Sequence, residues 1–184
     1  MRAQMLLLAL AGGLALSATL PQNPPVTRAA FANLERKLDR TILRLDVDDP
    51  YELLGNVRGV YLRGYGAVFT AELSLVPTSA YITPFDPDLT PADFRKLHQK
   101  KLAKLAPLKA FMRRMMVETA AELDSVPASE QIVLGVTLFY RSSEIKDGLP
   151  GQIVMQAPRQ TLLDYKAGRI KSSALEAAIR VQEL

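Results

Sequence analysis

The stretch VRGVYLRGYGAVFTAELSLV, residues 57–76, decides the fold of this chain because it holds two strand-like runs joined by an obvious turn. After the turn, apolar residues alternate with other residues from Ala67 to Leu75, and this period of two indicates a strand with one buried face. The first run, Val57–Leu62, is shorter, and Gly64 and Gly66 supply conformational freedom where the chain must reverse. The pattern predicts a β-hairpin, and because two strands alone are marginally stable in water, other segments must complete a sheet.

A second pair of strands is predicted nearer the C-terminus. Residues 131–141, QIVLGVTLFYR, are apolar at nearly every position, which is typical of a central strand covered on both faces. Residues 152–157 alternate again, and the connection between the two runs carries the turn dipeptide Asp147-Gly148. We therefore expect a second hairpin with a longer loop.

Helical periodicity predicts the cover of the sheet. Apolar residues recur every three or four positions from Phe31 to Leu45 and again from Asp93 to Leu123. Thr90 is placed to cap the second of these helices, and Pro107 inside it predicts a kink or a junction between two helices. Two short helices are expected after the second hairpin, one that ends at Gly168 and one from Ser173 to Gln182.

These elements predict a single α+β domain over residues 28–184. We expect a four-stranded, mainly antiparallel sheet built from the two hairpins and covered by helices. The predicted order of elements is α-β-β-α-β-β-α-α. At 184 residues, with 48% hydrophobic and 23% charged residues, the chain is long enough for one such domain and an export segment.

The first 18 residues have the composition of a secretory signal peptide. Arg2 precedes an apolar stretch from Met5 to Leu16, and small residues follow at the spacing that a signal peptidase requires. Residues 19–27 are predicted to form an extended spacer, since prolines break any helix there. The alternative is an uncleaved anchor, but the apolar run is shorter than the ~20 residues that a membrane span needs. We expect a periplasmic or secreted mature chain with no transmembrane span.

Cysteine is absent from the chain, which excludes a disulfide framework and a lipid-modified cysteine. Stability must therefore come from the hydrophobic core. A zinc site is not expected either, because His98 is the only histidine. The acidic residues between Asp46 and Glu52 lack the glycine and the spacing of an EF-hand, so we interpret them as a turn and predict no metal or cofactor.

Basic residues concentrate on the second long helix. Eight basic residues and one acidic residue lie between Asp93 and Arg114, within a chain whose formal net charge is +4. Such a stripe can attract the phosphates of an anionic lipid or glycan surface, whereas the alternative is a solvated helix face balanced by neighbouring acids. Export argues against nucleic acid as the partner. The residues predicted to contact an anionic surface are Lys96, Lys100, Lys104, Lys109 and Arg113.

Aromatic residues and an arginine gather on the first hairpin and on the proline-rich stretch that follows it. Pro77, Pro84, Pro87 and Pro91 exclude regular structure from this stretch, so it is predicted to be a long loop. If the loop folds over the end of the hairpin, these side chains form a site for a protein or peptide partner; the alternative is that the aromatic residues belong to the core. The predicted binding residues are Tyr61, Arg63, Tyr65, Tyr81 and Phe85.

A possible reactive centre is the sequence Ser143-Glu144-Ile145-Lys146, which matches the S-x-x-K pattern of penicillin-binding enzymes. The companion S-D-N and K-T-G patterns are missing, and the residues that follow predict a loop where the pattern requires a helix. We therefore expect an exported bacterial envelope protein that binds a protein or an anionic surface without catalysis. The alternative is a hydrolase that uses Ser143 on a peptide or cell-wall substrate.

Overall fold

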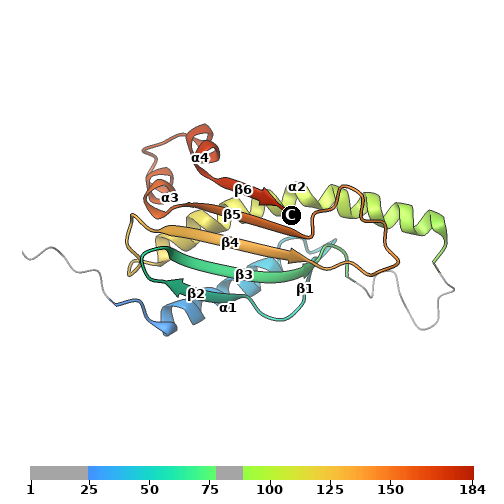
Figure 1. Ribbon diagram of the computed structural model, residues 1–184, viewed down its shortest axis with the longest axis horizontal. Helices are drawn as coiled ribbons and strands as arrows, with labels where there is room; N and C mark the ends of the chain where they lie inside the picture. The colour runs from blue at the N-terminus through green and yellow to red at the C-terminus, as the bar shows by residue number, and fades with distance from the viewer. Residues whose placement is uncertain (1–24, 78–88) are drawn as a thin grey trace, which may run out of the picture.

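The computed structural model describes residues 25–77 and 89–184, which fold into one six-stranded sheet and four helices (Figure 1). The helices are α1 (Arg28–Ile42), α2 (Pro91–Glu122), α3 (Arg159–Lys166) and α4 (Ser172–Ala178). The strands are β1 (Glu52–Leu53), β2 (Arg58–Leu62), β3 (Gly66–Ser74), β4 (Gln131–Leu138), β5 (Gln152–Pro158) and β6 (Arg180–Glu183). The predicted signal peptide, residues 19–24 of the spacer, and the loop residues Tyr81 and Phe85 lie outside the described residues.

The α+β class is confirmed, and both predicted hairpins belong to one sheet. Its strand order is β1-β3-β4-β5-β6, and β2 pairs with the same edge of β3 as β1 does. Every pairing is antiparallel except that of β3 with β4, which run parallel from Gly66↔Gln131 to Leu73↔Leu138. Parallel neighbours require a long crossover connection, and α2 provides it.

The predicted number of four strands is wrong, because β1 and β6 were missed. The helix predicted to run to Gln182 ends at Ala178, and Arg180–Glu183 pairs with β5 instead. Strands of two and four residues are too short to show a period in the sequence, and their hydrogen bonds come from β3 and β5. The observed order is therefore α-β-β-β-α-β-β-α-α-β.

Helix α2 begins as its sequence predicts. The Thr90 side chain accepts a hydrogen bond from the Asp93 amide, while the Asp93 carboxylate accepts one from the Thr90 amide, which completes a capping box. Pro107 lies inside one continuous helix and not between two. This proline is exposed, so the hydrogen bond that it removes is on the solvent side, while Leu105 and Leu108 pack into the core.

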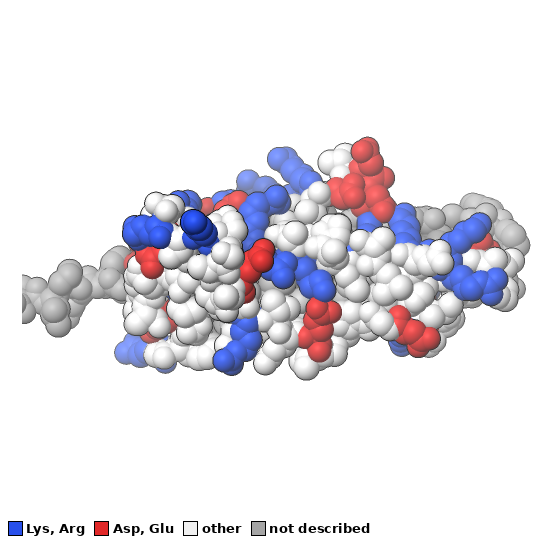
Figure 2. Space-filling view, turned by 90° about the horizontal axis from the view of Figure 1, so that it is seen from above, with Lys and Arg blue, Asp and Glu red and all other residues white. Residues whose placement is uncertain are grey.

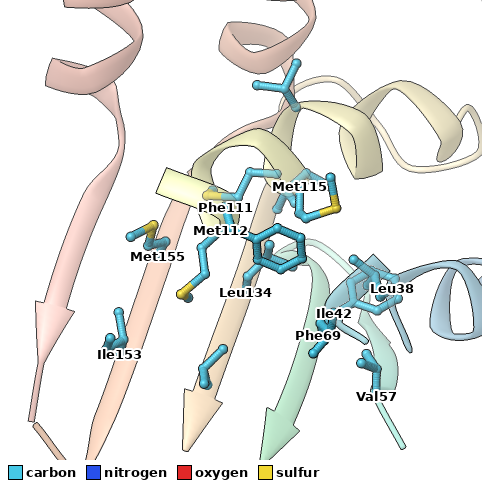
Figure 3. Packing of buried hydrophobic residues seen from close by; sticks show 14 of the residues in the cluster. Leu38, Ile42, Val57, Phe69, Phe111, Met112, Met115, Leu134, Ile153 and Met155 are labelled. Atoms are coloured by element: carbon cyan, nitrogen blue, oxygen red, sulfur yellow. The ribbon is translucent and has the colours of Figure 1, made fainter. Parts of the chain in front are cut away.

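One face of the sheet is covered by α1 and α2, which lie on the same side of it (Figure 1). Seen from above, basic and acidic side chains are interspersed among uncharged ones (Figure 2). Side chains of α1 and α2 converge on the strands (Figure 3). Phe69 of β3 stacks on Phe31 of α1, with 5.2 Å between the ring centroids. An apolar crevice of about 30 Å³ remains between the two helices, which is too small for a cofactor or drug-sized ligand.

A buried carboxylate joins α1 to β2. Glu35 accepts hydrogen bonds from the guanidinium of Arg28 at 2.6 and 2.7 Å and from the amide of Gly59 at 2.7 Å. The Arg28 side chain, followed by the Gly59 amide, lowers the pKa of Glu35 below its ordinary value of 4.5. Since the folded pKa is depressed, this stabilisation is complete above pH 4.5 and is lost as the pH falls through the folded value.

Glu35→Gln is expected to lower the free energy of unfolding by about 1–2 kcal/mol at pH 7. The difference from the wild type should shrink as the pH falls from 4.5 through the lower folded pKa, below which the wild-type carboxylate is also neutral. Urea unfolding between pH 3 and pH 7 measures it. Glu72→Gln is the matched control because Glu72 is exposed on β3, so a pH-dependent loss of the same size in that variant contradicts the assignment.

Candidate functional site

The second face of the sheet carries no helix in the described part of the chain, and it is the face toward the viewer in Figure 1. In β3, Phe69, Ala71 and Leu73 lie on the core side, so the alternating positions Val68, Thr70 and Glu72 point outward. The strand register then aligns Val60, Val68 and Val133 with Gln156 in one row across four strands. We call this surface the open sheet face.

Large apolar side chains are exposed at the hairpin end of the open sheet face. Val60 and Leu62 of β2 retain 50% and 46% of their accessible surface, and Tyr65 retains 43%. The Tyr65 ring reaches across β4, since its hydroxyl lies 3.4 Å from Oε1 of Gln156 on β5. At the opposite end, Phe139 follows β4 and is 42% exposed. Exposed apolar side chains that share one surface are typical of a protein interaction site.

The charges around this surface are mostly positive. Arg58 and Arg180 lie at its two edges, and Arg63 lies on the turn of the first hairpin. Within residues 25–77 and 89–184, no carboxylate lies within 4 Å of these three guanidinium groups. Glu72 of β3 and Glu52 of β1, which pairs with Ser74, are acidic residues on the face itself. The surface therefore combines exposed apolar side chains, mostly at its hairpin end, with arginines near its margins.

The structure separates the aromatic residues that the sequence grouped. Tyr61 pairs with Ala67, which has a fully buried side chain, so Tyr61 faces the helix side while Tyr65 lies on the open side. Tyr61 donates a hydrogen bond to Glu130 at 3.1 Å, and burial, together with this carboxylate, raises the pKa of Tyr61. Among the predicted binding residues that are described, Tyr65 lies at the open sheet face, and Arg63 is exposed on the turn. Tyr81 and Phe85 lie outside the described residues.

The predicted basic stripe does not form one exposed face. Lys104 is only 5% exposed: its ammonium group lies 4.4 Å from the centre of the Tyr51 ring and donates to the carbonyl oxygens of Asp49 and Pro50. Lys100 forms an ion pair with the Asp49 carboxylate at 2.8 Å. Burial lowers the pKa of Lys104 despite that carboxylate, and burial raises the pKa of Tyr51 to about 12. Lys104 therefore anchors the segment after α1 to α2.

The remaining residues of that stripe are dispersed along α2. Lys96 is exposed, Lys109 forms an ion pair with Glu183 of β6 at 2.8 Å, and Arg113 lines a groove beside α3 and α4. Contact of these residues with an anionic surface stays a prediction. Lys101, which the sequence did not distinguish from its neighbours, is 1% exposed and forms a buried ion pair with Glu144.

The predicted reactive serine lies in a turn. Ser143 is exposed next to Glu144, whose carboxylate is engaged by Lys101. The Nδ1 atom of His98 lies 3.1 Å from the carbonyl oxygen of Ile145. Lys146, which would follow one helical turn after the serine, is in a loop. The hydrolase hypothesis stays a prediction, and this geometry does not add to it.

Comparison with known proteins gives no further indication of function. No protein-family model, curated protein or solved structure matches it. Among the described residues, no helix is long and apolar enough to cross a membrane, and no group of three or more potential metal ligands occurs.

Proposed function

We propose that this chain is a non-catalytic interaction module of the bacterial envelope that binds a partner protein through the open sheet face. The exposure of Val60, Leu62 and Tyr65 on one rigid surface carries this proposal. Tyrosine is enriched among the residues that provide most of an interface's binding energy, and burying the neighbouring aliphatic side chains adds to it. The sheet holds these residues in place before binding, so little conformational entropy is lost.

The charges favour one kind of partner surface. Arg58 and Arg180 lie at the two edges of the open sheet face and Arg63 lies on the hairpin turn, so the complementary surface is apolar opposite the hairpin end and carries carboxylates at its margins. Standard strand spacings make a face of five strands about 24 Å wide, and seven residues span about 23 Å. That footprint, about 550 Å², is below the about 800 Å² per partner of a standard interface. We therefore expect a transient complex.

Photocrosslinking in the producing cells tests where the partner binds. Tyr65 is replaced by p-benzoyl-phenylalanine, which keeps the first aromatic ring and adds a photoreactive ketone, and the matched control carries the same group at Val47, which is 79% exposed away from the sheet. A protein adduct formed at position 65 and not at position 47 is the expected result. Equal labelling at both positions, or none at position 65, overturns the proposal. An adduct formed only with a second copy of the chain also overturns it, because it shows that the face mediates self-association and does not bind a different protein.

Leu62→Glu is then expected to weaken binding of the purified, identified partner about tenfold or more, because it puts a carboxylate among the exposed apolar side chains. Isothermal titration calorimetry measures the dissociation constant. Leu43→Glu is the matched control, since Leu43 is a leucine of similar exposure (56%) that lies after α1. An affinity that falls equally in both variants contradicts a site on the open sheet face.

A further inference from the structure

A groove separates the C-terminal half of α2 from α3 and α4. It encloses about 520 Å³, within the range of small-molecule sites. Figure 1 shows α4 standing away from the body of the molecule, joined to it through α3 and β6. Leu175 and Ile179, each 6% exposed, anchor α4, and the hydroxyls of Tyr165 and Ser172 lie 3.4 Å apart. The groove therefore forms because α4 is joined to the body through α3 and β6 and stands away from it.

The lining combines an apolar floor with two charged walls. Val117 of α2 and Leu175 of α4 form the apolar floor of the groove, with Tyr165 beside them. Both floor residues are at most 9% exposed. Arg113, Arg114 and Glu118 come from the α2 wall, and Glu176 comes from the α4 wall. Because Glu118 pairs with Lys37, a ligand that lies along this groove meets the two arginines on one side and apolar surface beneath.

The arginines of this groove are available to a ligand. Within the described ranges, no carboxylate lies within 4 Å of Arg113 or Arg114, although the guanidinium of Arg114 lies 5.6 Å from the centre of the Phe111 ring. Glu118, the acid nearest along the helix, instead forms an ion pair with Lys37 at 3.2 Å. Both arginines line the groove, and a guanidinium group can hold a planar carboxylate through paired hydrogen bonds.

We propose that this groove binds a small molecule or peptide end that carries one carboxylate and an apolar body. The carboxylate lies against Arg113 and Arg114, and the apolar body lies on Val117 and Leu175. Glu176 on the facing wall disfavours a ligand with two or more negative charges, which selects a carboxylate over a phosphate. This site is independent of the open sheet face, which lies on the other side of the sheet from α2.

NMR titration of the full chain with N-acetyl-leucine tests the site, with N-acetyl-leucinamide and inorganic phosphate as comparison probes. Saturable shifts of amides around Val117 and Leu175 are expected with the carboxylate probe, and binding of the amide is expected to be about tenfold weaker. Equal binding of the amide shows that the arginines do not select a carboxylate. Tighter binding of phosphate shows an anion site of another kind. Either result overturns the proposal.

Arg113→Gln and Arg114→Gln are each expected to weaken binding of the carboxylate probe about tenfold. Arg95→Gln is the matched control, because Arg95 is an exposed arginine near the other end of α2. Glu176→Gln is expected to tighten binding about twofold to threefold by removing the facing charge. An unchanged affinity in both groove arginine variants, or the same loss in Arg95→Gln, refutes the site. Leu62→Glu should leave this titration unchanged. The result therefore does not depend on whether the open sheet face binds a partner protein.

Discussion

Replacing Glu144 with glutamine is expected to lower the free energy of unfolding by about 3–5 kcal/mol, because it removes the charge that neutralises a buried lysine. The side chains of Lys101 and Glu144 are 1% and 3% exposed. Glutamine keeps the shape of the glutamate but leaves the Lys101 ammonium without this counter-charge, and an unbalanced charge inside a protein is costly.

The same ion pair holds an irregular segment against α2. The Lys101 ammonium lies 5.2 Å from the centre of the Tyr140 ring, whose hydroxyl donates to the carbonyl oxygen of Pro150 at 2.9 Å. Burial, with a smaller contribution from Glu144, raises the pKa of Tyr140 to about 12. The loss in Glu144→Gln should therefore include loosening of residues 139–151, which hydrogen exchange detects as faster exchange there.

Urea unfolding with two further variants separates the charge from the packing. Glu183→Gln removes an exposed partner of Lys109 and should cost less than about 1 kcal/mol. The double variant Lys101→Met with Glu144→Leu should recover most of the lost stability, since an apolar pair of similar size replaces the ion pair. If Glu144→Gln costs no more than Glu183→Gln, the ion pair is not the anchor that we describe.

Gly66→Ala is expected to destabilise the fold by about 4 kcal/mol or more, among the largest effects of a single substitution. Gly66 has φ +144°, and a Cβ atom added there would lie 1.9 Å from the carbonyl oxygen of Gln131 on β4. That neighbour is backbone, so the clash can be relieved only by separating β3 from β4 at the start of their parallel pairing.

Gly64→Ala in the same turn isolates the steric effect. Gly64 also has a positive φ, of +80°, but a Cβ atom there meets nothing within 4 Å. Its substitution should cost only the about 1–2 kcal/mol of a left-handed alanine. Thermal and urea unfolding of both variants measure the difference, and a Gly66→Ala variant no less stable than Gly64→Ala would show that the strands tolerate the clash.

Local patterns identified most of the regular elements. The alternation after Gly66 predicted β3, the apolar run from Gln131 predicted a central strand, and Thr90 marked the start of α2. These predictions were right because each signal is contained in the residues of the element itself. The strands β1 and β6 were missed because so few residues form them and they depend on hydrogen bonds to distant strands.

The candidate site was predicted only in part. Tyr65 was predicted as a binding residue from its type, but Val60 and Leu62 were read as part of a strand with no sign of which face water would reach. Alternation of apolar and polar residues shows that a strand has two different faces. Which of these faces is covered depends on where α1 and α2 lie. The separation of Tyr61 from Tyr65 follows from the same placement.

The order of residues along the chain was sufficient to establish the α+β class, the first hairpin and the amphipathic helices, because periodicity and capping act over a few residues. Tertiary packing alone decided which charges are buried. Lys100, Lys101 and Lys104 are equivalent as a stretch of basic helix, yet the segments around Tyr51 and Tyr140 bury the second and third of them. Contacts between residues tens of positions apart set the cost of burying a charge, and no local pattern in the sequence records them.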